Sequence, residues 1–249
     1  MSHWQIPTTL VERLRQAKRV TVLTGAGVSA ESKIPTFRDA QTGLWAKYRP
    51  EELATPEAFK ANPKMVWEWY QWRRELVERA HPNPGHHALV VMGEKIPHFS
   101  LITQNVDGLH QRAGSKQVIE LHGNIHRTKC WREGVVIEQA PESDQVPPPC
   151  PRCGAHLRPD VVWFGESLPP EAITRATEAS VRCEVFFSVG TSALVYPAAG
   201  FVYHAMQQGA YTVEINPDAT PQSSEVHHVL KGPSGQILPE LVKAAWGNS

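Results

Sequence analysis

Gly25-Ala26-Gly27 and Ser29 are the first residues whose types and spacing point to chemistry, and they directly follow a short apolar run. Small residues at such a turn let the backbone approach phosphate oxygens, and the N-terminus of a following helix attracts their charge. They are therefore consistent with a diphosphate site. A plain tight turn explains the same residues, because the third glycine of the usual dinucleotide fingerprint is missing from Val28-Ser29-Ala30. No acidic residue stands at the usual ribose-binding distance, which argues against an ordinary dehydrogenase.

Short apolar runs predict the strands that must position this turn. The runs at 19–24, 99–103, 185–189 and 211–215 each end in a polar or glycine-rich turn. Helical stretches lie between them, and residues 8–18 have apolar side chains at a helical period. This alternation predicts an α/β protein with a doubly wound, Rossmann-like parallel sheet that binds ligands at its strand ends.

Two stretches depart from the alternation. Residues 130–160 are rich in proline and hold three of the four cysteines, while 65–76 is an aromatic run without helix breakers, which predicts a helix covering a cleft. We expect a small module built from two insertions beside one large domain. The helical insertion spans about 41–84, the cysteine-containing, zinc-ribbon-like insertion about 126–159, and the large domain about 1–40, 85–125 and 160–249.

The composition is that of an ordinary globular protein, with 41% hydrophobic and 20% charged residues among 249. The formal net charge is zero, which disfavours a basic surface for nucleic acids or membranes. No apolar run reaches the roughly 20 residues that span a bilayer. Four cysteines are too few for a disulfide scaffold. We expect a reduced, cytoplasmic protein that binds neither membranes nor nucleic acids directly.

Five motifs, in order along the chain, resemble those of the sirtuin family of NAD-dependent protein deacylases. They lie between residues 20 and 235 and so cover most of the chain. One position of the first motif departs from the family pattern: Lys33 stands where glycine is usual, which costs free energy only if the backbone needs a positive φ there. The motifs are Gly25–Asp39, Thr103–His110, Leu121–Gly123, Gly190–Ser192 and Glu214–Asn216.

The resemblance implies that NAD is the cofactor. It implies that Asn105 orients the ribose or a water, and that Asp107 binds the nicotinamide carboxamide. Arg38 serves the phosphates or holds a loop, and Phe37 shields the reactive sugar from water. The implied NAD-binding residues are Gly25, Ala26, Gly27, Ser29, Ile34, Phe37, Arg38, Gln104, Asn105, Asp107, Gly190, Thr191, Ser192 and Asn216.

The implied reaction removes an acyl group from a protein lysine and yields nicotinamide and O-acyl-ADP-ribose. His122 matches the family's general base, which takes a proton from a ribose hydroxyl, and Asn105 is the second catalytic residue. The segment 161–166 matches the place where the substrate peptide adds as a strand, with Val161, Trp163, Phe164 and Gly165 as contacts. A core strand with an aromatic end explains the same residues.

Tyr70 and Arg73 lie three residues apart on the predicted helix and so share a face. A guanidinium beside a phenol suits a carboxylate. By its position the pair resembles the Tyr-x-x-Arg of the desuccinylase-type (class III) sirtuins, which implies removal of succinyl, malonyl or glutaryl groups besides acetyl. A solvated amphipathic helix is the alternative.

Most sirtuins hold a structural zinc with two C-x-x-C pairs. This chain has one complete pair and a single cysteine of the other. Cys150 and Cys153 form a complete pair, whereas Cys130 is followed three residues later by Glu133. We expect zinc on these three thiolates. The fourth ligand is Glu133, His126, His156 or a water. Alternatively, the site has decayed and packing alone holds the module; Cys183 precedes an apolar run and is expected in the core.

Two other functions share parts of this pattern. An NAD-dependent protein ADP-ribosyltransferase uses the same nicotinamide-cleaving step, and a non-catalytic NAD-binding or zinc-ribbon interaction module would keep the fold. The retained His122 and the peptide-binding segment 161–165 favour deacylation. Acylated proteins or peptides are the expected partners, and family resemblance implies a monomer.

Overall fold

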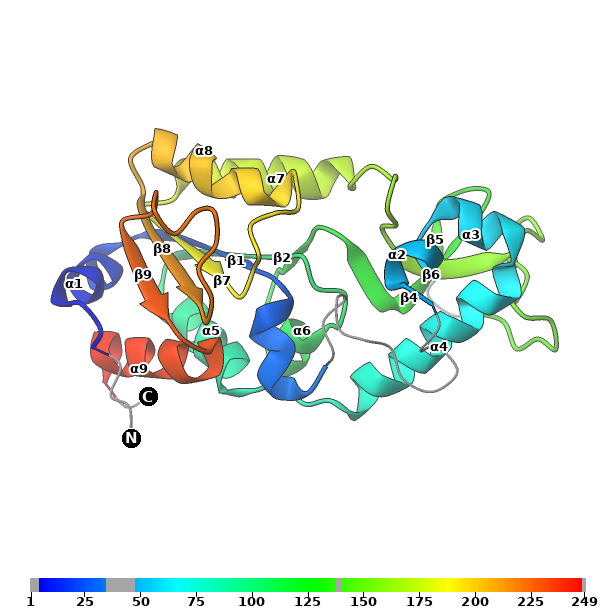
Figure 1. Ribbon diagram of the computed structural model, residues 1–249, viewed down its shortest axis with the longest axis horizontal. Coiled ribbons are helices and arrows are strands. Elements are labelled where there is room, and N and C mark those ends of the chain that lie inside the picture. Colours follow the sequence, from blue (N-terminus) through cyan, green and yellow to red (C-terminus); the bar gives the residue numbers. More distant parts are fainter. Residues whose placement is uncertain (1–4, 35–47, 138–139, 248–249) are drawn as a thin grey trace.

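The computed structural model describes residues 5–34, 48–137 and 140–247. Two β-sheets lie at opposite ends of the long axis of the molecule (Figure 1). The larger has six strands in the order β3-β2-β1-β7-β8-β9, and the smaller has three in the order β5-β4-β6. Both chain ends lie on the side of the larger sheet (Figure 1).

All neighbouring strands of the larger sheet are parallel, which confirms the predicted α/β class. The four predicted strands are its centre, and two short strands that the sequence did not predict extend its edges. Because parallel strands end at one edge of a sheet, the turns after them meet there. The strands are β1 (Arg19–Thr24), β2 (His98–Thr103), β3 (Ile119–Glu120), β7 (Val185–Val189), β8 (Tyr211–Asn216) and β9 (His228–Lys231).

Helices cover both faces of this sheet (Figure 1). Alternate strand residues point to opposite faces, so Val22 packs in a core with α1, α5 and α9, while Leu23 packs in a core with α7 and α8. The sheet is therefore doubly wound, as predicted. The helices are α1 (Thr8–Gln16), α5 (Pro84–Lys95), α9 (Ser234–Trp246), α7 (Pro170–Arg182) and α8 (Phe201–Gln207).

The smaller sheet is antiparallel and packs with three helices. Its strands are β4 (Gly123–Cys130), β5 (Val136–Ile137) and β6 (Leu157–Val161), and its helices are α2 (Pro50–Leu53), α3 (Pro56–Ala61) and α4 (Pro63–Arg79). The predicted helix over 65–76 is confirmed within α4. This helix begins at Pro63, and the side chain of the preceding residue, Asn62, caps it by accepting the Met65 N–H at 3.0 Å. Among the described helices, none has the length and hydropathy needed to span a bilayer.

Candidate active site

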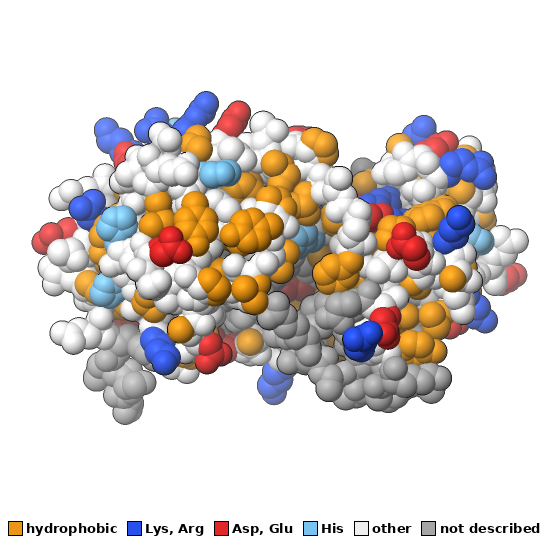
Figure 2. All heavy atoms as spheres, turned by 45° about the horizontal axis from the view of Figure 1, so that its top comes forward, with side chains coloured by type: hydrophobic (Ala, Val, Ile, Leu, Met, Phe, Trp, Pro, Cys, Tyr) orange, Lys and Arg blue, Asp and Glu red, His pale blue; other side chains and the backbone are white. Residues whose placement is uncertain are grey.

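A cavity of about 1340 Å³ lies between the two sheets, at the carboxyl ends of β1, β2, β7 and β8. Figure 2 shows the surface hollowed between these two parts of the molecule. Its volume exceeds the range of about 300–1000 Å³ usual for small-ligand pockets, so it has room for a dinucleotide and a second reactant. Phe37 and Arg38 lie outside the described residues. The other predicted NAD and substrate residues line it: Gly25, Ala26, Gly27, Ser29, Ile34, Tyr70, Arg73, Gln104, Asn105, Asp107, His122, Val161, Trp163, Phe164, Gly165, Gly190, Thr191, Ser192 and Asn216.

The glycine turn after β1 packs directly against the turn after β7. The Gly27 N–H donates to the Gly190 carbonyl at 2.7 Å, and a Cβ on Gly27 would lie 2.7 Å from the Gly190 Cα. A Cβ on Gly25 would lie 2.8 Å from the Gly190 oxygen, and Gly190 itself has φ +59°. These glycines are therefore required by backbone-to-backbone packing as well as by any phosphate. The element that follows is a 3₁₀ helix, η1 (Ala26–Ser32), instead of an α-helix.

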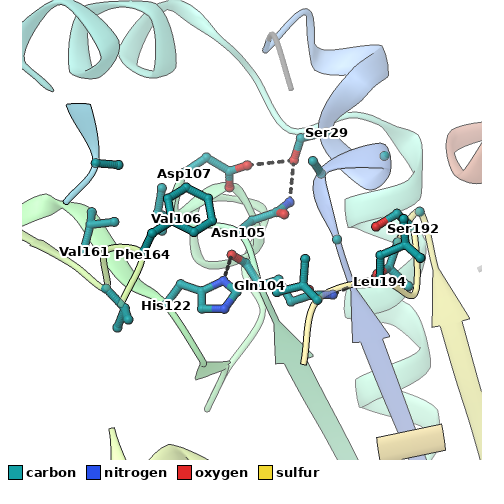
Figure 3. Close-up of a pocket in the computed structure, with 18 of the residues that line it drawn as sticks. Ser29, Gln104, Asn105, Val106, Asp107, His122, Val161, Phe164, Ser192 and Leu194 are labelled. Carbon is teal, nitrogen blue, oxygen red and sulfur yellow. Dashed lines mark hydrogen bonds between the residues drawn. The ribbon is translucent and has the colours of Figure 1, made fainter. Parts of the chain in front are cut away.

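Three polar side chains after β1 and β2 form one network (Figure 3). The Ser29 hydroxyl donates to Asp107 Oδ2 at 2.8 Å and accepts from Asn105 Nδ2 at 3.1 Å. The second Asp107 oxygen accepts the Leu109 N–H at 2.9 Å. Burial is the main cause that raises the pKa of Asp107, against the lowering effect of these bonds. The network fixes the Asp107 carboxyl on the cavity wall.

His122 is held by one ring nitrogen and presents the other. Its Nδ1 lies 2.8 Å from the Gln104 backbone oxygen, so Nδ1 carries the proton and donates it (Figure 3). Nε2 then has a free lone pair and is the atom that acts as a base. Burial lowers the pKa of His122, partly offset by this hydrogen bond, so the ring is neutral at neutral pH.

Tyr70 and Arg73 lie on α4 and line the cavity beside Val77, Val106 and Ile125. Tyr70 is buried, and its hydroxyl accepts a hydrogen bond from Trp163 Nε1 at 2.9 Å. Desolvation raises the pKa of Tyr70 to about 12, so it stays a neutral donor. The Arg73 guanidinium also lies over the Trp69 ring, 5.2 Å from its centroid.

Large apolar side chains stand exposed on the cavity wall. Phe164 is 50% exposed, Leu194 56% and Tyr196 70%. Single exposed apolar residues need no explanation, but a group of them along one cavity does. The sequence did not single out the residues that follow Gly190-Thr191-Ser192, although the apolar run Ala193-Leu194-Val195-Tyr196 after a glycine turn was the available signal.

The cysteine module brings together four ligand groups. One ligand atom each from Cys130, Glu133, Cys150 and Cys153 lies within 4.8 Å of the others, whereas His126 and His156 are absent from this group. Tetrahedral zinc at about 2.3 Å from sulfur places its ligands roughly 3.8 Å apart, so these residues fit the metal. Among the alternatives left open, the structure favours Glu133 as the fourth ligand. Cys183 is buried away from the group and donates to the Ser180 carbonyl, as expected for a core residue.

Comparison with known proteins decides the family. Residues 25–197 match the model of the Sir2 family. The chain belongs to the Sir2 family. This match covers more than half of the chain and includes the glycine turn, His122 and the cysteine module.

The relatives of this Sir2 protein carry the name NAD-dependent protein deacylase. One from Aquifex aeolicus is 55% identical over 87% of this chain and 91% of its own, and one from Pseudomonas aeruginosa is 46% identical over 95% and 98%. A solved structure of a Sir2 homologue in complex with NAD has a TM-score of 0.90 and 45% identity, covering 97% of this chain and 94% of that chain. A Sir2 structure with a deacetylated p53 peptide and 3′-O-acetyl ADP ribose has a TM-score of 0.82 and 32% identity, covering 97% and 98%.

Lys33 is the residue at which the first motif of this sirtuin departs from the family pattern, and it has φ 62° and ψ 26°. That is the left-handed region, in which a Cβ is unfavourable by about 1–2 kcal/mol. Its N–H donates to the Ala30 carbonyl at the end of η1, and its side chain is exposed. The backbone here does favour glycine, and lysine occupies it at a cost.

Sequence reasoning missed His86 of this sirtuin. Its Nδ1 accepts the Asn83 N–H at 3.2 Å, so its Nε2 carries the proton and faces the Ser29 hydroxyl at 3.4 Å. His86 therefore supports the Ser29–Asp107 pair from behind. The available signal was the run Asn83-Pro84-Gly85-His86, which makes His86 the third residue of a capped helix.

Proposed function

We propose that this chain removes acyl groups from lysine side chains of other proteins and uses NAD to accept them. The observation that carries the proposal is the meeting of residues from five separate motifs on one cavity, with Nε2 of His122 free to take a proton. When bound, NAD supplies an electrophilic sugar carbon and nicotinamide as the leaving group. The deacylase names of the relatives support the same reaction.

The polar residues of the cavity divide the work. We infer that Asp107, fixed by Ser29 and the Leu109 N–H, binds the nicotinamide carboxamide, and that Asn105 orients the ribose or a water. His122 holds the proton of a ribose hydroxyl at Nε2, because Nδ1 is committed to the Gln104 carbonyl. The buried walls exclude water from the reacting carbon.

The substrate peptide lies along the exposed apolar residues of the cavity in this proposal. The segment 162–166 leaves β6 and is held by the Val162 N–H on the His122 carbonyl and by the Phe164 N–H on the Ala54 carbonyl. A peptide that pairs by backbone with this segment and packs on Leu194 is held without strong sequence preference. Acylated proteins are then the partners, and the acyl-lysine reaches inward towards Tyr70.

The inner end of the cavity suits an acyl group that ends in a carboxylate. Arg73 offers a permanent positive charge and Tyr70 a neutral hydroxyl, both on the same turn of α4. Partial burial strengthens the interaction of a carboxylate with both groups. We therefore propose succinyl and malonyl lysine as substrates besides acetyl lysine.

Zinc on Cys130, Glu133, Cys150 and Cys153 would have a structural role, because the thiolates stabilise the module that carries β6.

The test incubates the purified protein with NAD and matched acetyl- and succinyl-lysine peptides, following peptide mass and nicotinamide release. We expect one nicotinamide to be released for each peptide lysine that loses its acyl group. In Arg73→Met we expect a selective loss of desuccinylation. The matched control is Arg79→Met, because this exposed arginine lies on the same helix and pairs only with Glu75 among the described residues. Nicotinamide release with ADP-ribose attached to the protein or peptide would instead indicate ADP-ribosyl transfer. Turnover of acetyl lysine alone would retain the enzyme and refute the carboxylate site.

A further inference from the structure

Trp163 is held rigidly from two sides. The Arg158 guanidinium lies over its ring, 3.3 Å from the centroid, and Glu166 Oε2 accepts its backbone N–H at 2.8 Å. Arg158 and Glu166 bind each other in turn through two N–H donors. Trp163 is 2% exposed and Arg158 3%, so neither has room for another rotamer. The direction of the indole N–H is therefore fixed by Arg158 and Glu166.

This fixed N–H meets the hydroxyl of Tyr70. Trp163 Nε1 donates to Tyr70 Oη at 2.9 Å, and both side chains are buried. A phenol has a single proton, and a proton directed at Trp163 would clash with the indole N–H. The Tyr70 proton must therefore turn away from Trp163. In the described part of the chain this hydroxyl forms no other hydrogen bond, and Tyr70 lines the cavity next to Arg73.

We propose that Trp163 is the positioning residue for acyl selectivity: its N–H orients the Tyr70 hydroxyl proton towards the acyl end of the cavity, where it donates to a carboxylate. Trp163 acts through Tyr70, in place of contacting the acyl group itself. An acetyl group has no oxygen beyond its carbonyl to accept this proton, whereas a succinyl or malonyl group has two. The inference rests on the proposed deacylation and names the residue that sets its preference.

The direct test is Trp163→Phe, which keeps an aromatic ring on Arg158 and removes the N–H. The measured quantity is the ratio of kcat/KM for succinyl-lysine to kcat/KM for acetyl-lysine peptides. We expect this ratio to fall about fivefold, the effect of weakening one hydrogen bond to a charged group, because the KM for the succinyl-lysine peptide rises. In a Tyr70→Phe background the same substitution should leave the ratio unchanged, because no hydroxyl remains to be oriented.

Trp131→Phe is the matched control. This indole also lies near Arg158 and Trp163, with its ring 5.6 Å from the Arg158 guanidinium carbon, but it donates nothing to Tyr70. The ratio should stay that of the wild type. If Trp163→Phe does not fold, benzothienylalanine at position 163 replaces the N–H by sulfur and keeps the two-ring shape. The same fivefold fall is expected of it.

Three results would overturn the inference. One is an unchanged ratio in the folded Trp163 variants, and another is a further fall of the ratio when Trp163→Phe is added to Tyr70→Phe. The third is a wild-type protein that removes acetyl but not succinyl groups. This result would agree with deacylation and refute the role of Trp163 in acyl selectivity. Loss of all NAD-dependent deacylation in the wild type would refute the proposed function first.

Discussion

The imidazole rings of His86 and His110 lie 4.9 Å apart in the core behind the active site, and both side chains are fully buried. His110 Nε2 lies 2.9 Å from the Thr24 hydroxyl, while its Nδ1 has no partner among the described residues. Desolvation is the main cause that lowers the pKa of His86 to about 4 and that of His110 to about 3. Repulsion from His87 lowers the pKa of His86 further, and repulsion from His86 lowers the pKa of His110. Both rings are therefore neutral in the folded protein at physiological pH.

This pair predicts a loss of stability on acidification. A folded pKa below the unfolded value of about 6.5 means that the unfolded chain binds more protons, so the free energy of unfolding falls as pH drops below about 6.5. Each histidine contributes a slope of up to about 1.4 kcal/mol per pH unit until its folded pKa is reached. Urea unfolding between pH 5 and 7 measures this slope.

The slope should be shallower by one histidine in His110→Gln and unchanged in the control His98→Gln, because His98 is exposed and is not a cause of the lowered pKa of His86 or His110. Asp107 lies close by and has a raised pKa, which makes stability fall as pH rises, but it is common to all three proteins and cancels in the comparison. An equal slope in His110→Gln and in the wild type would contradict the contribution of His110 to the pH dependence of stability.

His122→Asn should abolish deacylation and preserve NAD binding. The loss of a general base costs about 10²–10⁴-fold in turnover, while the groups proposed to hold the dinucleotide remain. Single-turnover peptide mass gives the rate, and titration of the protein with NAD gives the affinity. Because burial lowers the pKa of His122, the acidic limb of kcat/KM in the wild type should lie below pH 6.5. A variant that turns over at the wild-type rate would refute the role of His122 as general base.

Lys33→Gly should stabilise the protein. The left-handed backbone at φ 62° is unfavourable for lysine by about 1–2 kcal/mol, and the added freedom of glycine in the unfolded chain returns part of this. We expect a net gain of about 1 kcal/mol in the free energy of unfolding, measured by urea denaturation. Lys33→Ala, which retains a Cβ, should not give the gain.

Zinc should bind at one ion per chain through three thiolates and Glu133. Glu133→Cys completes a four-thiolate site and should slow zinc release to a chelator, while Glu133→Ala should hasten it. Zinc content by elemental analysis and the thermal midpoint both report the effect without any activity assay. Glu142→Ala, an exposed glutamate of the same module, is the control. Full-length protein that holds no zinc would show that packing alone maintains the module.

Local sequence patterns predicted the central strands because each is an apolar run bounded by a glycine or polar turn. The edge strands β3 and β9 escaped prediction because two and four residues carry too little pattern. The motifs named most of the cavity wall, but Leu194 reaches the wall only through the packing of the turn after β7, and His86 reaches Ser29 behind the wall only through the packing of α5. The sequence spacing likewise left open which group lies beside the three cysteines, because only the fold brings Glu133 within 4.8 Å of their sulfur atoms.

The contact between Gly27 and Gly190 joins residues that are far apart in the sequence. The glycine turn after β1 packs against the turn at Gly190, which is synthesised much later. β1 must pair with β7 before the two turns meet. A nascent chain that ends before Gly190 therefore has no assembled cofactor pocket, whatever it has already folded. The cofactor pocket therefore forms late in synthesis, after β7 has paired with β1 and the turn at Gly190 has packed on the turn at Gly27.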